Sequence, residues 1–226
     1  MTEHRTGTRE EWLTREHAAA LAVTLGLAGG GWVVTVRQMS GMDMGVATSL
    51  GSFTFFLGFW VPMMAAMMLP AAVPAVAAFT RATRHVAAAP LFVASYIAVW
   101  SLFGVAAFAL YDQHSYTAAG ALTIAAGFYE LTPFKRACRR RCRESVRSGF
   151  EFGLFCVGSS VGLMAILLAL GAMSVTWTAA IAAVVLAQKL LPPKASADAF
   201  VALGIVALGM LLVFAPASVP ALAGPM

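Results

Sequence analysis

The sequence predicts an all-α protein: a polytopic membrane helix bundle with seven transmembrane helices, or six if one marginal segment does not span. Three observations lead to this prediction. Hydrophobic residues make up 60% of the 226 residues, and charged residues only 11%, a composition typical of membrane proteins. Apolar runs of about 20 residues, the length that crosses a bilayer, recur along the chain. Nearly all cationic residues fall on one side of the resulting topology.

Seven apolar runs, separated by charged or turn-forming residues, define the expected helices. They cover residues 18–36, 53–80, 90–111, 117–134, 150–172, 174–191 and 198–215. The runs 117–134 and 174–191 are short, and they decide between six and seven spans. We expect a single transmembrane domain over 18–215, between a cytoplasmic tail (1–17) and a C-terminal tail (216–226). No cleavable signal peptide is expected, because the first 17 residues are rich in Arg and Glu.

The cationic residues orient this topology. If the amino terminus is cytoplasmic, fourteen of the fifteen Lys and Arg residues lie in the first tail or in inner loops, and only Arg37 lies outside. Positive residues accumulate on the cytoplasmic side of short loops, so we expect a cytoplasmic amino terminus. Anionic lipid headgroups on that side account for the net charge of +5, and nucleic acid is excluded as its reason.

The first outer loop is a candidate metal-binding segment. It places Met39, Met42 and Met44 with Asp43 within six residues, in the stretch "MSGMDM". Thioethers are soft ligands that select Cu(I), and they remain usable where thiols would be oxidised. The alternative is that these methionines are adaptable apolar cover at a helix end.

The stretch "WVPMMAAMMLP", residues 60–70, carries four methionines inside the second expected helix. At 100° per residue, Met63, Met67, Met64 and Met68 lie at about 0°, 40°, 100° and 140°, so they share one face. Trp60 falls within the same arc at about 60° and would shield whatever the sulfurs contact. Two readings stay open, a Cu(I) site built on i, i+4 pairs and ordinary apolar packing.

The basic stretch "KRACRRRCR" adds two thiols on the cytoplasmic side. Cys138 and Cys142 lie at i, i+4 on an expected amphipathic helix, where neighbouring arginines should lower the thiol pKa and favour metal-binding thiolates. The alternative is a basic segment on lipid headgroups with two incidental thiols. We expect its cations to form a lipid- or partner-facing surface: Lys135, Arg136, Arg139, Arg140, Arg141 and Arg143. Glu130, just before it, should pair with one of these cations.

The fifth expected helix carries the third thiol. Cys156, Ser160 and Met164 share a face at i, i+4, i+8, which offers a soft Cys/Met pair or, alternatively, a small-residue packing face. An odd number of cysteines argues against a disulfide framework. The histidines lack a metal-binding spacing, and no nucleophile triad, phosphate loop or dinucleotide motif occurs, so an enzyme mechanism has no support.

The motifs "WVPMMAAMMLP", "FYELTPFKRACRRRCR", "FCVGSSVGLM" and "GAMS…QKLLP", in this order, resemble a bacterial family of predicted metal-binding integral membrane proteins of unknown function. The resemblance covers about residues 40–191 and implies a multi-helix inner-membrane protein. The chain departs from the family pattern at four positions. Ser159 and Ser160 replace two cysteines, Gln188 replaces a glutamate, and Glu130 replaces a glutamine. Loss of two thiolates weakens a site on the fifth helix, whereas the methionines, Cys138 and Cys142 are retained.

These observations favour a membrane protein that binds a soft metal, Cu(I), for copper transport, delivery or metallation of a membrane enzyme. The metal would pass from the outer methionines to those of the second helix and then to the cysteines: Met39, Met42, Met44, Met63, Met64, Met67, Met68, Cys138, Cys142 and Cys156. The competing hypothesis is a non-catalytic subunit or assembly factor of a larger membrane complex, such as a copper oxidase or monooxygenase, with no metal of its own.

Overall fold

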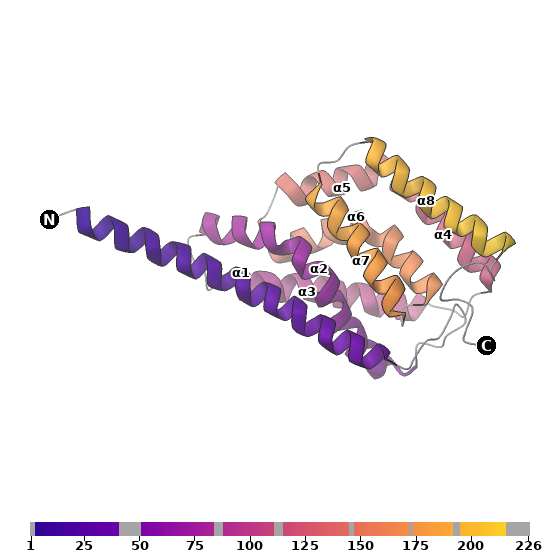
Figure 1. Ribbon diagram of the computed structural model, residues 1–226, viewed down its shortest axis with the longest axis horizontal. Coiled ribbons are helices and arrows are strands. Elements are labelled where there is room, and N and C mark those ends of the chain that lie inside the picture. Colours follow the sequence, from indigo (N-terminus) through magenta and orange to yellow (C-terminus); the bar gives the residue numbers. More distant parts are fainter. Residues whose placement is uncertain are drawn as a thin grey trace.

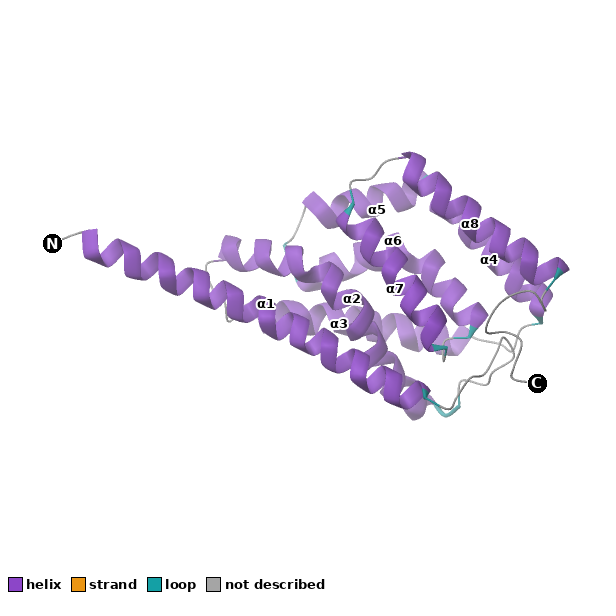
Figure 2. Ribbon diagram, in the orientation of Figure 1, coloured by secondary structure: helices purple, strands orange, loops and turns teal. Residues whose placement is uncertain are grey.

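The computed structural model describes residues 3–40, 51–83, 88–110, 115–144, 147–171, 174–191 and 195–215. Within these ranges it is all-helical, with eight helices and no strand (Figures 1 and 2), so the all-α prediction is confirmed. The helices are α1 (Glu3–Met39), α2 (Phe53–Thr83), α3 (Ala88–Leu110), α4 (Tyr116–Glu130), α5 (Pro133–Glu144), α6 (Gly149–Leu170), α7 (Val175–Leu190) and α8 (Ala195–Phe214).

Helix α1 begins well before the apolar run at 18–36. It starts at Glu3, and its amino-terminal half projects beyond the bundle in Figure 1. Residues 3–17 contain no proline and several strong helix formers, such as Glu and Arg, so nothing in this stretch ends the helix. The segment predicted as a tail is therefore largely helical.

Helix α2 forms the centre of the bundle and packs against α1, α3 and α7. It continues through Pro62, Pro70 and Pro74, each of which removes one backbone hydrogen bond. Helix α1 comes closest at Gly31, where a Cβ atom would lie 2.8 Å from the carbonyl oxygen of Pro62. A side chain at position 31 would therefore push α1 away from the central helix.

Helices α4 and α8 form a tight pair at the end of the bundle away from α1 (Figure 1). Their backbones approach at Gly120 and Gly209. A Cβ atom on Gly209 would lie 2.9 Å from the carbonyl oxygen of Gly120 and 2.6 Å from Ile124, so this contact requires glycine. Small residues at helix crossings allow such close backbone approach.

A matched pair of substitutions on α8 tests this packing. Gly209→Ala should destabilise the protein by about 1–3 kcal/mol, because the added methyl group collides with α4. Gly204→Ala is the control, since a Cβ atom there meets nothing within 4 Å. We expect it to be neutral or stabilising by up to about 1 kcal/mol, because alanine reduces the entropy of the unfolded chain. Thermal unfolding in detergent compares the two, and equal midpoints would contradict the contact.

Helix α5 is the short amphipathic helix expected in the basic stretch. Thr132 caps its amino terminus by accepting a hydrogen bond from the Lys135 backbone nitrogen at 3.3 Å, and Pro133 occupies the first helical position. Its buried positions are Lys135, Cys138, Arg139 and Cys142, which follow the i, i+3, i+4, i+7 pattern of one helix face. This face packs against α6 and turns both thiols into the protein.

Four helical segments are long and apolar enough to cross a membrane: Ala18–Met39, Phe53–Thr83, Ala88–Leu110 and Gly149–Leu170. The apolar parts of α7 and α8 are shorter. Helix α4 has 15 residues, which extend about 22 Å against a hydrocarbon core of about 30 Å. The seven-span topology and the cytoplasmic amino terminus stay predictions.

Candidate metal centre

The methionines of α2 lie in the core of the protein. Met63, Met64, Met67 and Met68 are 0–1% exposed, so the shared face predicted from helical periodicity is fully covered by neighbouring helices. Met39, at the end of α1, is also buried, whereas Met42 and Met44 lie outside the described residues. Burial alone fits both packing and metal binding, and the ligand role of these sulfurs stays a prediction.

The Trp60 indole joins α2 to α3. Its Nε1–H donates a hydrogen bond to the carbonyl oxygen of Trp100 at 3.0 Å, and its ring stacks on Phe56 with 5.2 Å between centroids. The ring also fills the space beside Gly104, where a Cβ atom would lie 2.4 Å from Nε1. These contacts give Trp60 a structural role at the α2–α3 contact.

The three cysteines are reduced and buried where α5 and α7 meet α6. The i, i+4 spacing directs Cys138 and Cys142 to the same neighbour. Cys138 lies against Gly158, where a Cβ atom would come within 2.8 Å of its sulfur. The Cys156 sulfur lies 3.2 Å from the hydroxyl of Tyr96 on α3. Cys142 and Cys156 belong to the same cluster of buried core residues, so the structure associates the α5 thiol with a thiol of α6.

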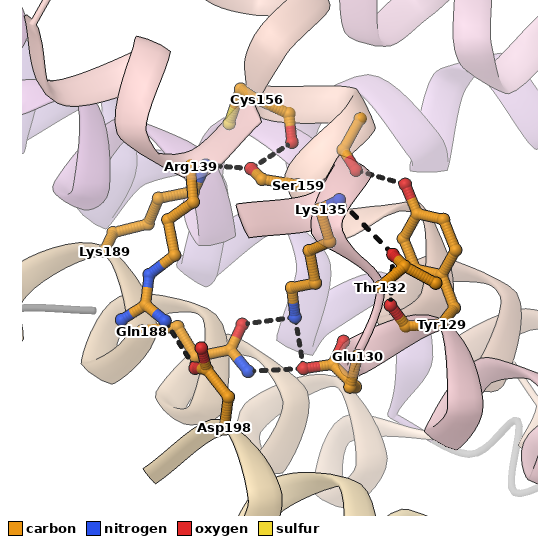
Figure 3. Close-up of polar contacts among 11 residues, drawn as sticks. Tyr129, Glu130, Thr132, Lys135, Arg139, Cys156, Ser159, Gln188, Lys189 and Asp198 are labelled. Carbon is orange, nitrogen blue, oxygen red and sulfur yellow. Dashed lines mark hydrogen bonds and ion pairs between the residues drawn. The ribbon is translucent and has the colours of Figure 1, made fainter. Parts of the chain in front are cut away.

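Lys189 of α7 connects these thiols. Its ammonium lies 3.7 Å from the Cys142 sulfur, interacts with the Cys156 thiol and donates a hydrogen bond to the Ser159 hydroxyl. Ser159 in turn donates to the Cys156 carbonyl oxygen at 2.9 Å. Figure 3 shows Ser159 between the Lys189 side chain and Cys156. We call Cys142, Cys156, Ser159 and Lys189 the thiol cluster. Sequence reasoning missed Lys189, which it counted only as an inner-loop cation.

The α5 thiols are less acidic than the surrounding arginines predict. Burial raises the pKa of Cys142 to about 12, although the charge of Lys189 opposes the shift. Burial likewise raises the pKa of Cys138, against the charges of Lys189 and Arg141. The expectation of lowered pKa values is therefore wrong, because the thiols face α6 whereas Arg140, Arg141 and Arg143 are exposed. Both thiols are protonated at neutral pH, and a metal ion must displace their protons.

A buried ion pair lies beside the thiol cluster. Lys135 forms a salt bridge with Glu130, which confirms the ion pair expected for this carboxylate. Gln188 bridges the pair, since its amide nitrogen donates to Glu130 at 2.6 Å and its amide oxygen accepts from Lys135 at 3.0 Å. In Figure 3 the three side chains converge from α4, α5 and α7. Burial lowers the pKa of Lys135, and the Glu130 charge partly offsets this shift.

Two positions at which the sequence departs from the pattern that the resemblance implies lie in this contact. Glu130 and Gln188 are hydrogen-bonded to each other, and both contact Lys135, so a carboxylate and an amide share one buried cation.

Two cations assigned to the lipid- or partner-facing surface do not lie on it. Lys135 is 2% exposed and Arg139 is 3% exposed. Arg139 forms a salt bridge with Asp198 of α8 at 2.5 Å and donates to the Leu191 carbonyl oxygen at 3.2 Å. Their positions on the buried face of α5 require partners, because an unpaired charge inside a protein is costly. Arg136, Arg140, Arg141 and Arg143 are exposed, and their contact with lipid or a partner stays a prediction.

The chemistry of the donor set limits which metal the chain accepts. Among the described residues, no group of three or more His, Cys, Asp or Glu side chains is arranged to hold a metal. Sulfur is the donor that the core does supply. Cys142, Cys156, Met164 and the buried methionines of α1 and α2 belong to one continuous cluster of core residues. Soft sulfur donors suit Cu(I), and the oxygen-rich site of a hard cation is not formed by the described residues.

Comparison with known proteins identifies a family. No curated protein and no solved structure shows significant similarity to the chain. A family model, PpoB2, described as "Copper chaperone", matches residues 57–212. The matched segment contains the four α2 methionines and all three cysteines. Since it spans more than half of the sequence, the chain belongs to the PpoB2 copper chaperone family.

Proposed function

We propose that this protein is a membrane-embedded copper chaperone that holds Cu(I) between the thiolates of Cys142 and Cys156. The observation that carries the proposal is the family match, because it covers the helices that bring these thiols together. Two thiolates and one Cu(I) ion form a complex of charge −1. The Lys189 ammonium beside both sulfurs would neutralise this charge inside the protein.

The surface of the bundle supports a membrane location. Large apolar side chains on α1, α3 and α8 are exposed, for example Val23 at 62%, Leu102 at 63% and Phe200 at 77%. Apolar surface of this kind is stable in lipid and unfavourable in water. We propose a bacterial inner-membrane protein with seven spans and a cytoplasmic amino terminus, in which exposed arginines of α5 contact anionic headgroups.

The buried methionines extend the proposed site toward the opposite side of the membrane. Copper would enter through the loop containing Met42 and Met44, pass Met39 and the α2 thioethers, and reach the thiolates on the cytoplasmic side. The continuous core cluster that contains both methionines and cysteines supports this path. A membrane-bound copper enzyme, such as an oxidase or monooxygenase, is the proposed recipient.

A Cu(I) competition titration tests the function. The full chain, purified in detergent under reducing conditions, should take one equivalent of Cu(I) from a chromophoric chelator. Replacing Met63, Met64, Met67 and Met68 together with leucine should slow copper uptake and leave the final stoichiometry unchanged, because the methionines lie on the path and not at its end. Failure of the parent chain to compete for Cu(I) would refute the proposal.

The affinity should depend on pH. The Cys142 thiol, with a pKa of about 12, is protonated below that pH and releases its proton when it binds Cu(I). Binding is therefore favoured as pH rises, by about tenfold per pH unit for each proton displaced. Titrations at pH 6, 7 and 8, corrected for the chelator's own protonation, measure this dependence. An affinity independent of pH would mean that Cys142 does not bind as a thiolate.

A further inference from the structure

A cavity of about 360 Å³ adjoins the thiol cluster. Its lining includes small residues of α2: Ala71, Ala75 and Ala78. Cys142, Arg143 and Lys189 also line the cavity. The lining also includes Leu190, which is 54% exposed, and Arg143 is exposed as well, so the cavity reaches the surface of the molecule. It therefore leads from the outside to Cys142.

Transfer of Cu(I) needs such an opening. A two-coordinate Cu(I) ion is transferred by ligand exchange, in which an incoming sulfur ligand binds before an existing ligand leaves. The incoming ligand must therefore reach the buried metal. Small-molecule pockets occupy about 300–1,000 Å³, and this cavity lies at the lower end of that range. A folded protein domain does not fit into it, but a thiol of a few heavy atoms does.

The charges around the cavity select the ligand. Arg143 and Lys189 both line it, and none of the described residues in its lining is acidic. Arg143 is fixed by donating from Nη1 to the Leu191 carbonyl oxygen at 2.9 Å. A guanidinium has five N–H donors, so one such bond leaves others for an anion. The alanine side chains of α2 in the lining carry no charge.

We infer that this cavity is an exchange port in which a small anionic thiol, anchored by Arg143, takes Cu(I) from Cys142 or delivers it. The inference rests on the proposed function and names its small-molecule partner. In the outward step, a thiolate of the small molecule forms a bond to Cu(I), the bond between Cu(I) and Cys142 breaks, and Cys142 takes a proton from water. A second thiolate then displaces Cys156 in the same way, so that Cu(I) leaves as a complex of two small thiolates. Copper remains Cu(I) throughout. The reverse step loads the protein.

The first test uses the unmodified chain loaded with Cu(I). Stopped-flow absorbance follows copper removal by mercaptosuccinate, which carries two carboxylates, by neutral 2-mercaptoethanol and by cationic cysteamine. Each rate is divided by the concentration of the thiolate form of that thiol. We expect mercaptosuccinate to remove copper at least about tenfold faster than cysteamine, because paired cations attract an anion into the cavity. Equal rates for the three thiols would overturn the inference.

Two variants locate the effect. Arg143→Gln should lower the ratio of the mercaptosuccinate and cysteamine rates severalfold relative to the unmodified chain, and comparing the ratio between the two chains cancels the intrinsic reactivity of each thiol. Ala78→Leu should slow all three thiols severalfold by filling the cavity. Ala94→Leu is the matched control, since Ala94 lines a separate apolar groove between α1 and α3. If Ala78→Leu and Ala94→Leu exchange copper equally fast, the cavity is not the port.

The outcomes also separate this inference from the proposed function. A chain that takes up no Cu(I) refutes the copper chaperone proposal itself. A chain that binds one equivalent but exchanges it without regard to thiol charge, Arg143 or Ala78 keeps that function and loses only the exchange port.

Discussion

Replacing Cys142 and Cys156 together with serine is expected to weaken Cu(I) binding by at least about a hundredfold. The two thiols lie on different helices, and Lys189 contacts both. Changes in the outer shell of a metal site already reduce affinity by about 10–100-fold, so loss of both proposed ligands should exceed that range. Serine retains the size of cysteine but removes the soft donor that Cu(I) prefers.

Cys138→Ser is the control for this experiment. Cys138 lies one turn before Cys142 on α5, and its sulfur packs against Gly158 of α6. We therefore expect this substitution to weaken Cu(I) binding by less than about tenfold. The measurement is a competition titration of the full chain in detergent. A large loss in Cys138→Ser with none in Cys156→Ser would favour the i, i+4 pair of α5 predicted from the sequence. Parent affinity in the double variant would leave only the thioethers as ligands.

The second large effect concerns stability. Glu130→Gln should lower the free energy of unfolding by about 3–5 kcal/mol, because it leaves the Lys135 ammonium buried without an anion. Adding Gln188→Glu should restore most of the loss. The Gln188 amide oxygen is already 3.0 Å from Lys135, so a carboxylate at position 188 supplies the missing charge in place.

Thermal or denaturant unfolding in detergent measures both variants. Glu151→Gln serves as the control because it makes the same chemical change at the start of α6. There the carboxylate interacts mainly with the helix dipole, so a loss of only about 0.3–1 kcal/mol is expected. If Gln188→Glu fails to rescue Glu130→Gln, the two positions do not exchange roles.

Much of the fold is predictable from local sequence. Apolar runs indicated the membrane-type helices, and Thr132 with Pro133 sets the start of α5. The face of α5 is harder to predict. Lys135 and Arg139 look like surface cations in the sequence, and only Glu130 on α4 and Asp198 on α8 explain why they are buried. Contacts between distant segments determine this feature, and composition does not report them.

The candidate site was predictable only in part. The types and positions of the proposed sulfur ligands follow from the sequence, but the association of Cys142 with Cys156 depends on how α5 lies on α6. The raised pKa of Cys142 also depends on this packing, because burial outweighs the nearby positive charges. Lys189 could have been noticed as a cation at the end of an apolar helix, yet its partners are 30 and 47 residues away in sequence.

The most direct test of the central claim is the copper K-edge X-ray absorption spectrum of the Cu(I)-loaded chain. We expect a two-coordinate Cu(I) spectrum with only sulfur in the first shell, and its loss in the Cys142→Ser, Cys156→Ser double variant. A first shell of nitrogen or oxygen, or an unchanged spectrum in the double variant, would contradict it.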